Sequence, residues 1–215
     1  VPYIPPPGYW QMVRQACNDH GALLIFDEIP TGLGKTGKMF ACEHDDVVPD
    51  ILVLGKALGG GILPIAAVLA KSELDVAGEF AFGHYTHEKN PVTAKAALTT
   101  IEIIEQEGLV ENAAELGKYM LEQLNLLKAK HSTIGDVRGR GLLVGVELVL
   151  NQEGKTPAND LAEDVLYRCL SKGLSFKLTM GKVMTRTPPL IMERGEMELA
   201  WEIIDQGLSE AERAC

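Results

Sequence analysis

Short apolar runs that end in a charged residue mark the first part of this chain. Residues 22–26 are apolar throughout and are followed directly by Asp27, and residues 51–54 precede Lys56 by one glycine. Runs that are apolar on both faces are typical of central strands in a sheet covered by helices. Open α/β sheets bind ligands at the carboxyl ends of such strands. We therefore expect Asp27 and Lys56 to point into the same crevice at that edge.

Helical and strand-like patterns continue along the chain. Apolar positions at helical spacing predict helices near residues 9–18, 92–107, 110–127, 160–171 and 195–212. Apolar or alternating stretches predict further strands near residues 65–70, 142–150, 173–178 and 183–187. We expect an α/β protein in two parts, with a sheet in residues 1–108 and a smaller α+β domain in residues 109–215.

Length and composition narrow the class of protein. The 215 residues are 46% hydrophobic and 23% charged, which is the balance of a folded chain and not of a disordered one. A formal net charge of −10 argues against a nucleic-acid partner, because phosphate binding needs clustered cations. No apolar run is long enough for a membrane span. Four widely spaced cysteines fit a reducing, cytoplasmic compartment.

The glycine-rich stretch at residues 30–38 allows three interpretations. Residues 32–37 match G-x-G-x-x-G, but a dinucleotide site needs this loop to open into a long helix, and residues 39–44 are too few. A P-loop needs Ser or Thr where Met39 stands. A turn-rich connection is the interpretation that we favour.

Two histidines and one acid are the residues that most resemble a metal-binding motif. His84, His87 and Glu88 lie close in sequence, but their spacing is not H-E-x-x-H. We expect polar packing within a loop and no metal site.

Lys56 carries the most specific chemistry in the chain. A lysine that follows a buried strand and precedes the glycines at 59–61 is expected to be partly desolvated, and desolvation lowers a lysine pKa. Such a lysine can form a Schiff base with an aldehyde. Asp27 could then pair either with this lysine or with the pyridinium nitrogen of a cofactor.

These residues stand inside a longer pattern that resembles a known family. Residues 23–70 are similar to the class III pyridoxal-phosphate aminotransferases of fold type I, which carry D-E-x-x-T-G…P-D…K-x-x-x-G-G. The resemblance implies that Asp27 pairs with the pyridinium nitrogen and that Lys56 forms the Schiff base with pyridoxal 5'-phosphate. It also implies that residues 1–108 are the second half of the large cofactor domain and that 109–215 are the small carboxyl-terminal domain.

Three later segments extend the resemblance. Residues 86–91 look like the T-F-G-G-N-P loop, whose threonine binds the cofactor phosphate of the neighbouring subunit, which implies that role for Thr86 and a homodimer or higher homo-oligomer. Residues 136–148 resemble the strand that opens the small domain. Residues 185–190 resemble the R-x-x-P-P-L-like strand whose arginine holds the substrate carboxylate, and Arg186 is matched to that arginine.

The chain departs from the family pattern in three ways. Pro30 stands where many members have a glutamine that contacts the phenolic oxygen of the cofactor, and residues 87–89 replace an aromatic residue and glycines. Family members are about twice as long, and the half with the Gly-Ser phosphate cup and the stacking aromatic has no counterpart here. The chain therefore resembles the carboxyl-terminal half of such an enzyme.

The function implied is transfer of an amino group between an amine or amino acid and a 2-oxo acid. Two alternatives stay open. One is a pyridoxal-phosphate lyase or decarboxylase that acts on an amino compound with an anionic group, and the other is an inactive fragment. The expected partners are small-molecule substrates and further copies of the chain, with no nucleic acid and no membrane.

Overall fold

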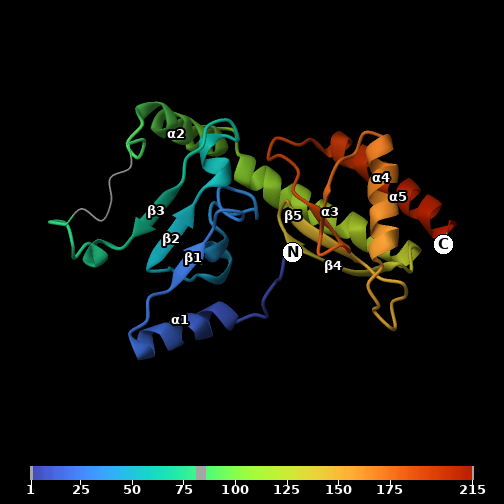
Figure 1. Ribbon diagram of the computed structural model, residues 1–215, viewed down its shortest axis with the longest axis horizontal. Coiled ribbons are helices and arrows are strands. Elements are labelled where there is room, and N and C mark those ends of the chain that lie inside the picture. Colours follow the sequence, from blue (N-terminus) through green and yellow to red (C-terminus); the bar gives the residue numbers. More distant parts are fainter. Residues whose placement is uncertain (1, 81–85, 215) are drawn as a thin grey trace. The chain divides into compact units, whose positions relative to one another are not determined.

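The computed structural model describes residues 2–80 and 86–214 (Figure 1). These form two compact units: residues 5–110 make the first, and residues 2–4 with 111–214 make the second. The predicted boundary, after residue 108, stands two residues before this division. Residues 2–4 belong with the second unit because the carbonyl of Pro2 accepts a hydrogen bond of 2.9 Å from Arg138 Nε.

The first unit is built on a small mixed sheet. The strands are ordered β1-β2-β3, with β1 parallel to β2 and β3 antiparallel to β2. All three predicted strands are present, the first and third in shortened form. The elements are α1 (Tyr9–His20), β1 (Ile25–Asp27), η1 (Ala41–Asp45), β2 (Ile51–Leu54), η2 (Lys56–Gly59), β3 (Ala67–Ala70), η3 (Ser72–Leu74) and α2 (Pro91–Gln106).

The strands of this sheet are more exposed than their sequence predicted. Leu54 is buried, but Ile25 is 55% exposed and Val68 is 68% exposed. The sequence predicted strands covered on both faces, and that prediction is wrong for the described residues. The reason is that these residues supply no apolar layer over Ile25 or Val68.

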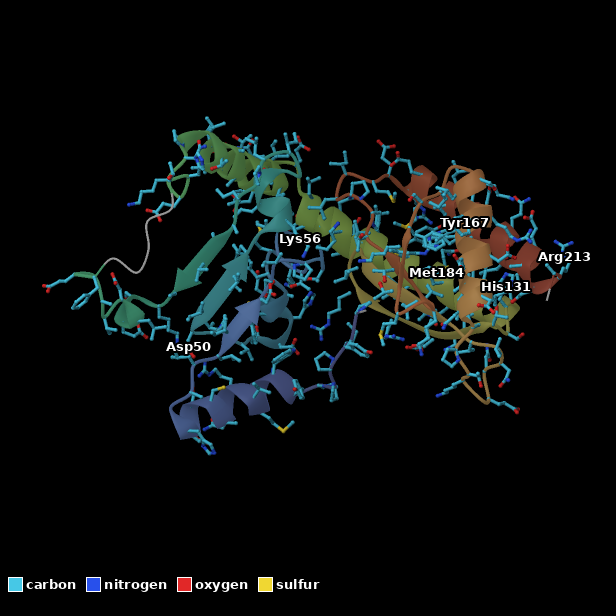
Figure 2. All side chains as sticks on the ribbon, in the orientation of Figure 1. Asp50, Lys56, His131, Tyr167, Met184 and Arg213 are labelled. Atoms are coloured by element: carbon cyan, nitrogen blue, oxygen red, sulfur yellow. The ribbon has the colours of Figure 1, made fainter. Side chains whose placement is uncertain are left out.

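Asp50 joins α1, the residue before β1 and the residue after β3 (Figure 2). Its Oδ2 accepts hydrogen bonds from Arg14 Nη1 at 2.7 Å and from the backbone N–H of Leu24 at 2.8 Å. Its Oδ1 accepts one from Lys71 Nζ at 2.7 Å. Together these contacts hold the pKa of the Asp50 carboxyl far below its usual range, the hydrogen bond from Lys71 being the largest cause. Asp50 is therefore an ionised carboxylate that links Arg14, Leu24 and Lys71 at the end of the sheet where β2 begins.

The second unit is a four-stranded antiparallel sheet with helices. Its strand order is β4-β5-β7-β6. The sequence predicted one strand over residues 142–150, whereas the structure has the hairpin β4–β5, which turns at Gly141 with φ of 52°. The elements are α3 (Leu109–Lys130), β4 (Ile134–Arg140), β5 (Leu143–Leu148), α4 (Asn159–Ser171), β6 (Lys177–Thr179), β7 (Val183–Arg186) and α5 (Arg194–Glu212).

One face of this sheet forms the main core. Alternate residues of β5, namely Val144, Val146 and Leu148, are fully buried, and they pack with side chains of α3, α4 and α5. The intervening residues of a strand point to the opposite face. The register of each strand from β4 to β7 therefore decides whether a side chain lies on the helix-covered face or on the other face.

Among the helices of the described residues, none is long and apolar enough to cross a bilayer.

Candidate active site

Asp27 and Lys56 stand at the carboxyl ends of two strands that pair in parallel. Asp27 is the last residue of β1 and pairs with Val53 of β2, and Lys56 begins the turn that follows β2. β1 and β2 run in the same direction (Figure 1). Parallel strands present their carboxyl ends at one edge of a sheet, so Asp27 and Lys56 both lie at that edge. This part of the predicted arrangement is confirmed.

The backbone at Lys56 adopts an unusual conformation. Its φ is 44°, in the left-handed region that residues with a side chain rarely occupy. Strain of this kind costs about 1–3 kcal/mol and is concentrated at functional sites. The side chain of Lys56 is exposed, so the predicted partial desolvation is wrong for the described residues, which leave this side chain open to solvent.

Asp27 is oriented by the chain that follows it. The backbone N–H of Ile29 donates a hydrogen bond of 3.1 Å to Asp27 Oδ1. The side chain of Ile29 packs over Gly55, where an added Cβ would lie 3.4 Å from Ile29 Cγ1. The turn after β1 thus contacts both the carboxylate at the end of β1 and the residue immediately before Lys56.

Glu28 is a buried acid that the sequence analysis did not single out. Its carboxylate accepts hydrogen bonds from the backbone N–H groups of Ala41 at 2.6 Å and Cys42 at 2.7 Å, while its own N–H donates to Val53 O at 2.9 Å. It is 4% exposed. Glu28 therefore closes the loop after β1 onto the sheet. The hydroxyl of Thr31 also donates to Glu28 Oε2, at 3.5 Å. The backbone partners leave no trace in a sequence pattern, whereas Thr31 stands in the same D-E-x-x-T-G stretch.

The glycine-rich stretch forms the turn-rich connection that we predicted. It leads into the short 3₁₀ helix η1 and not into a long helix, which excludes the dinucleotide and P-loop interpretations. Gly32 fits here because an added Cβ would lie 3.1 Å from Glu28 O and 3.4 Å from Leu54 Cδ2. The stretch therefore packs against the end of β2, next to Lys56.

Thr86 lies in the loop that precedes α2. The residues Thr86 to Pro91 line an open hollow of about 420 Å³. The side chain of Asn90 caps the helix by accepting a hydrogen bond of 2.9 Å from the N–H of Val92. Thr86, His87 and Glu88 are exposed. A hydroxyl close to the amino-terminal end of a helix is a suitable donor for a phosphate.

The described residues hold no group of three or more His, Cys, Asp or Glu side chains that could bind a metal ion. His84, one of the two histidines considered above, lies outside residues 2–80 and 86–214.

Arg186, the last residue of β7, lies in the second unit. It is 6% exposed, and its guanidinium lies 4.9 Å from the ring centroid of Phe176 and 5.7 Å from that of Trp201. Its Nε and Nη2 have no hydrogen-bond partner among the described residues. Burial lowers the pKa of Arg186 to about 10, so the group stays charged at neutral pH.

Both units have the architecture of pyridoxal-phosphate transferases of fold type I. An aminotransferase from Bacillus anthracis superposes on the chain with a TM-score of 0.91 and 36% sequence identity, covering 96% of this chain and 49% of that one. The family model for class III aminotransferases matches residues 2–208. The chain belongs to the class III aminotransferase family, whose members depend on pyridoxal phosphate.

Curated relatives of the chain carry out several reactions. A (R)-1-hydroxy-2-aminoethylphosphonate ammonia-lyase from Vibrio splendidus is 45% identical over 96% of this chain and 43% of its own length. A leucine/methionine racemase from Thermococcus litoralis is 42% identical over 98% of this chain and 46% of its own length. The chain thus spans about half the length of the curated relatives it matches.

Proposed function

We propose that the protein carrying this chain is a pyridoxal-phosphate-dependent aminotransferase. It moves an amino group between an amine or amino acid and a 2-oxo acid. The observation that carries the proposal is the pairing of β1 with β2, because it brings Asp27 and Lys56 to one edge of a parallel strand pair. The membership of the family and the left-handed backbone of Lys56 support it.

The residues of the first unit fit the cofactor chemically. Lys56 offers an amine for an aldehyde, Asp27 a carboxylate for a pyridinium nitrogen, and Thr86 a hydroxyl for a phosphate. The Asp27 carboxylate has a fixed orientation, because Ile29 N–H already holds one of its oxygens. Pyridoxal phosphate, when bound, supplies a ring that withdraws electrons from the substrate carbon.

The roles of the three side chains follow from their chemistry. Lys56 Nζ would hold the cofactor aldehyde as an imine, formed with loss of water, until the substrate amine displaces it. As a free amine, Lys56 would then move a proton from the substrate α-carbon to the cofactor carbon. The Asp27 carboxylate keeps a proton on the pyridine nitrogen through a charge-assisted hydrogen bond. Thr86 Oγ1 donates to the phosphate bound by a neighbouring subunit. The role of Arg186 in substrate binding is a prediction from the resemblance alone.

A lyase acting on an amino compound with an anionic group is the second candidate. The name of the relative from Vibrio splendidus favours it, because that protein is an ammonia-lyase of an aminophosphonate and is 45% identical to this chain. The two reactions use the same lysine and differ in the fate of the amino group. A transferase passes nitrogen to a 2-oxo acid, whereas an ammonia-lyase releases it.

One experiment separates the candidates. The complete protein is purified with pyridoxal phosphate and offered amines, amino acids and aminophosphonates with and without 2-oxo acids. A transferase forms a new amino acid only when a 2-oxo acid is present. A lyase releases ammonia in its absence. A protein that takes up no cofactor and forms neither product contradicts both candidates and leaves the inactive fragment.

We also infer that the protein is at least a dimer and works in the cytoplasm. Thr86 is exposed, and the resemblance to the family gives its hydroxyl the cofactor phosphate of a neighbouring subunit. Cys17, Cys42 and Cys169 are all free, which suits a reducing compartment. Sedimentation of the complete protein at micromolar concentration tests the first inference, and a fully active monomer would contradict it.

A further inference from the structure

His131 is a buried histidine of the second unit that the proposed reaction does not use. It follows α3 directly, and its side chain is 2% exposed. Its backbone is fixed on both sides, because its N–H donates to Leu127 O at 2.8 Å and its carbonyl accepts from the N–H of Ile134 at 3.1 Å. The ring is therefore held at the point where α3 ends and β4 is about to begin.

Both ring nitrogens of His131 face carboxylates of α5. Nδ1 lies 2.8 Å from Glu212 Oε2, and Nε2 lies 2.7 Å from Asp205 Oδ1. Asp205 and Glu212 stand about two turns apart on one face of the helix. Figure 2 shows His131 near the end of the second unit at which Arg213, the residue after Glu212, is labelled. One histidine thus links the end of α3 to both acids.

A neutral imidazole cannot donate to both acids. It carries hydrogen on one nitrogen and a lone pair on the other, whereas an imidazolium carries hydrogen on both, and an ionised carboxylate only accepts. Burial alone would raise the pKa of the Asp205 carboxyl, but hydrogen bonds from Lys130 and His131 outweigh this effect and lower that pKa. Asp205 is therefore an ionised acceptor at neutral pH. With Glu212 ionised as well, the two contacts require an imidazolium.

The charges around the ring balance when the ring is charged. Lys130 Nζ donates to Asp205 Oδ1 at 2.7 Å, and the hydroxyl of Thr133 donates to Glu212 Oε1 at 2.5 Å. Lys130 and an imidazolium then face two carboxylates, whereas a neutral ring would leave one negative charge in excess. The position directly after α3 also favours a cation, because the carboxyl end of a helix carries partial negative charge.

We propose that His131 is a buried imidazolium that clamps the end of α3 to α5, and that loss of one ring proton at alkaline pH releases the last turn of α5. Once that proton has passed to solvent, one ring nitrogen is an acceptor that faces a carboxylate oxygen, and one of the two bonds is lost. Asp205 keeps its bond from Lys130, so the loss falls mainly on Glu212. The stabilisation is therefore present while the ring is charged and disappears as pH rises.

The release is local. Leu208 and Ala211 of α5 are fully buried in the core, so the helix as a whole stays packed. The clamp lies entirely within the second unit and is independent of the proposed reaction.

Nitrogen-15 spectra of the His131 ring in the complete protein test its charge directly. At pH 7 both ring nitrogens should give the signal of a protonated nitrogen, and the signals are assigned by their absence in His131→Gln. A neutral ring that faces a protonated Glu212 would have the same distances but one unprotonated nitrogen. That result at pH 7 overturns the proposal.

Amide hydrogen exchange in the peptide that ends at Glu212 tests the release. At pH 7 exchange should be about ten-fold or more faster in His131→Gln than in the wild type, because a charge-assisted hydrogen bond is lost. Glutamine donates to one acid only, as a neutral ring does, so the ratio of the two rates should approach one at pH 9.5. Comparison at the same pH cancels the effect of pH on exchange itself.

The control is His20→Gln, which alters the exposed histidine at the end of α1. It should exchange as the wild type does at both pH values. A ratio near one at pH 7 contradicts the clamp, and a high ratio that is the same at pH 7 and pH 9.5 contradicts the release.

Discussion

The backbone N–H of Ile29 donates to Asp27 Oδ1, so the carboxylate that ends β1 is oriented by the turn that follows it. Asp27→Asn keeps an oxygen acceptor for this bond and removes the negative charge. Since a protonated ring nitrogen needs that charge, we expect kcat to fall by about 100-fold or more while the cofactor still binds. Steady-state kinetics and cofactor absorbance measure the two effects. The exposed Asp19→Asn serves as the control, and near-normal turnover in Asp27→Asn would refute the assignment.

Lys56 is expected to carry the cofactor covalently. Borohydride reduction of the complete, cofactor-loaded protein, followed by peptide mapping, should place the label on the peptide that contains Lys56. In Lys56→Met the label should disappear, while Lys38→Met, which alters another exposed lysine of the same unit, should leave it in place. A label on any other lysine contradicts the prediction.

Glu28 should control the reactivity of Cys42. Burial raises the pKa of the Cys42 thiol to about 12, and the negative charge of Glu28 adds to the effect. The thiolate is the reactive form, so Cys42 should react slowly with a thiol reagent at pH 8. Glu28→Gln removes the charge and frees the N–H of Ala41 or Cys42, so we expect faster labelling of Cys42 and a lower melting temperature. Mass spectrometry of the Cys42 peptide measures the labelling rate. An unchanged rate in Glu28→Gln would contradict the control of Cys42 by Glu28.

The sequence predicted β2 to the residue, because four apolar residues lie between Asp50 and Gly55 and leave little freedom. The apolar pattern missed β4, since residues 134–140 mix glycines with charges. The family resemblance indicated one strand over residues 136–148, where the structure has two strands paired in a hairpin. The positions of Asp27 and Lys56 were predictable, because they follow recognisable runs.

Two features of the candidate sites depend on tertiary contacts that no local pattern contains. Glu28 is held by backbone N–H groups 13 and 14 residues further along the chain. The burial of Arg186 depends on Phe176 and Trp201, which come from other elements.

Asp50 should make the stability of the first unit depend on acid pH. Its pKa in the folded chain lies far below the unfolded value of about 3.9, because Lys71, the Leu24 N–H and Arg14 stabilise the charged form. A group with a lowered folded pKa stabilises fully above the unfolded pKa, and this stabilisation is lost as pH falls through and below about 3.9. Asp50→Asn should therefore be less stable at pH 7 and lose less on acidification than the wild type. Urea unfolding at pH 7, 5 and 3 tests this, and parallel curves for both proteins would contradict it.

Two helical glycines of the second unit should respond in opposite ways to alanine. A Cβ on Gly117 of α3 would collide with the backbone of Gly141, whereas one on Gly195 of α5 would meet nothing within 4 Å. Backbone cannot move aside as a flexible side chain can, so Gly117→Ala should destabilise by about 3 kcal/mol. Gly195→Ala should stabilise by about 0.5 kcal/mol, because alanine restricts the unfolded chain. Thermal unfolding of both variants measures the difference, and equal melting temperatures would show that α3 does not approach Gly141 this closely.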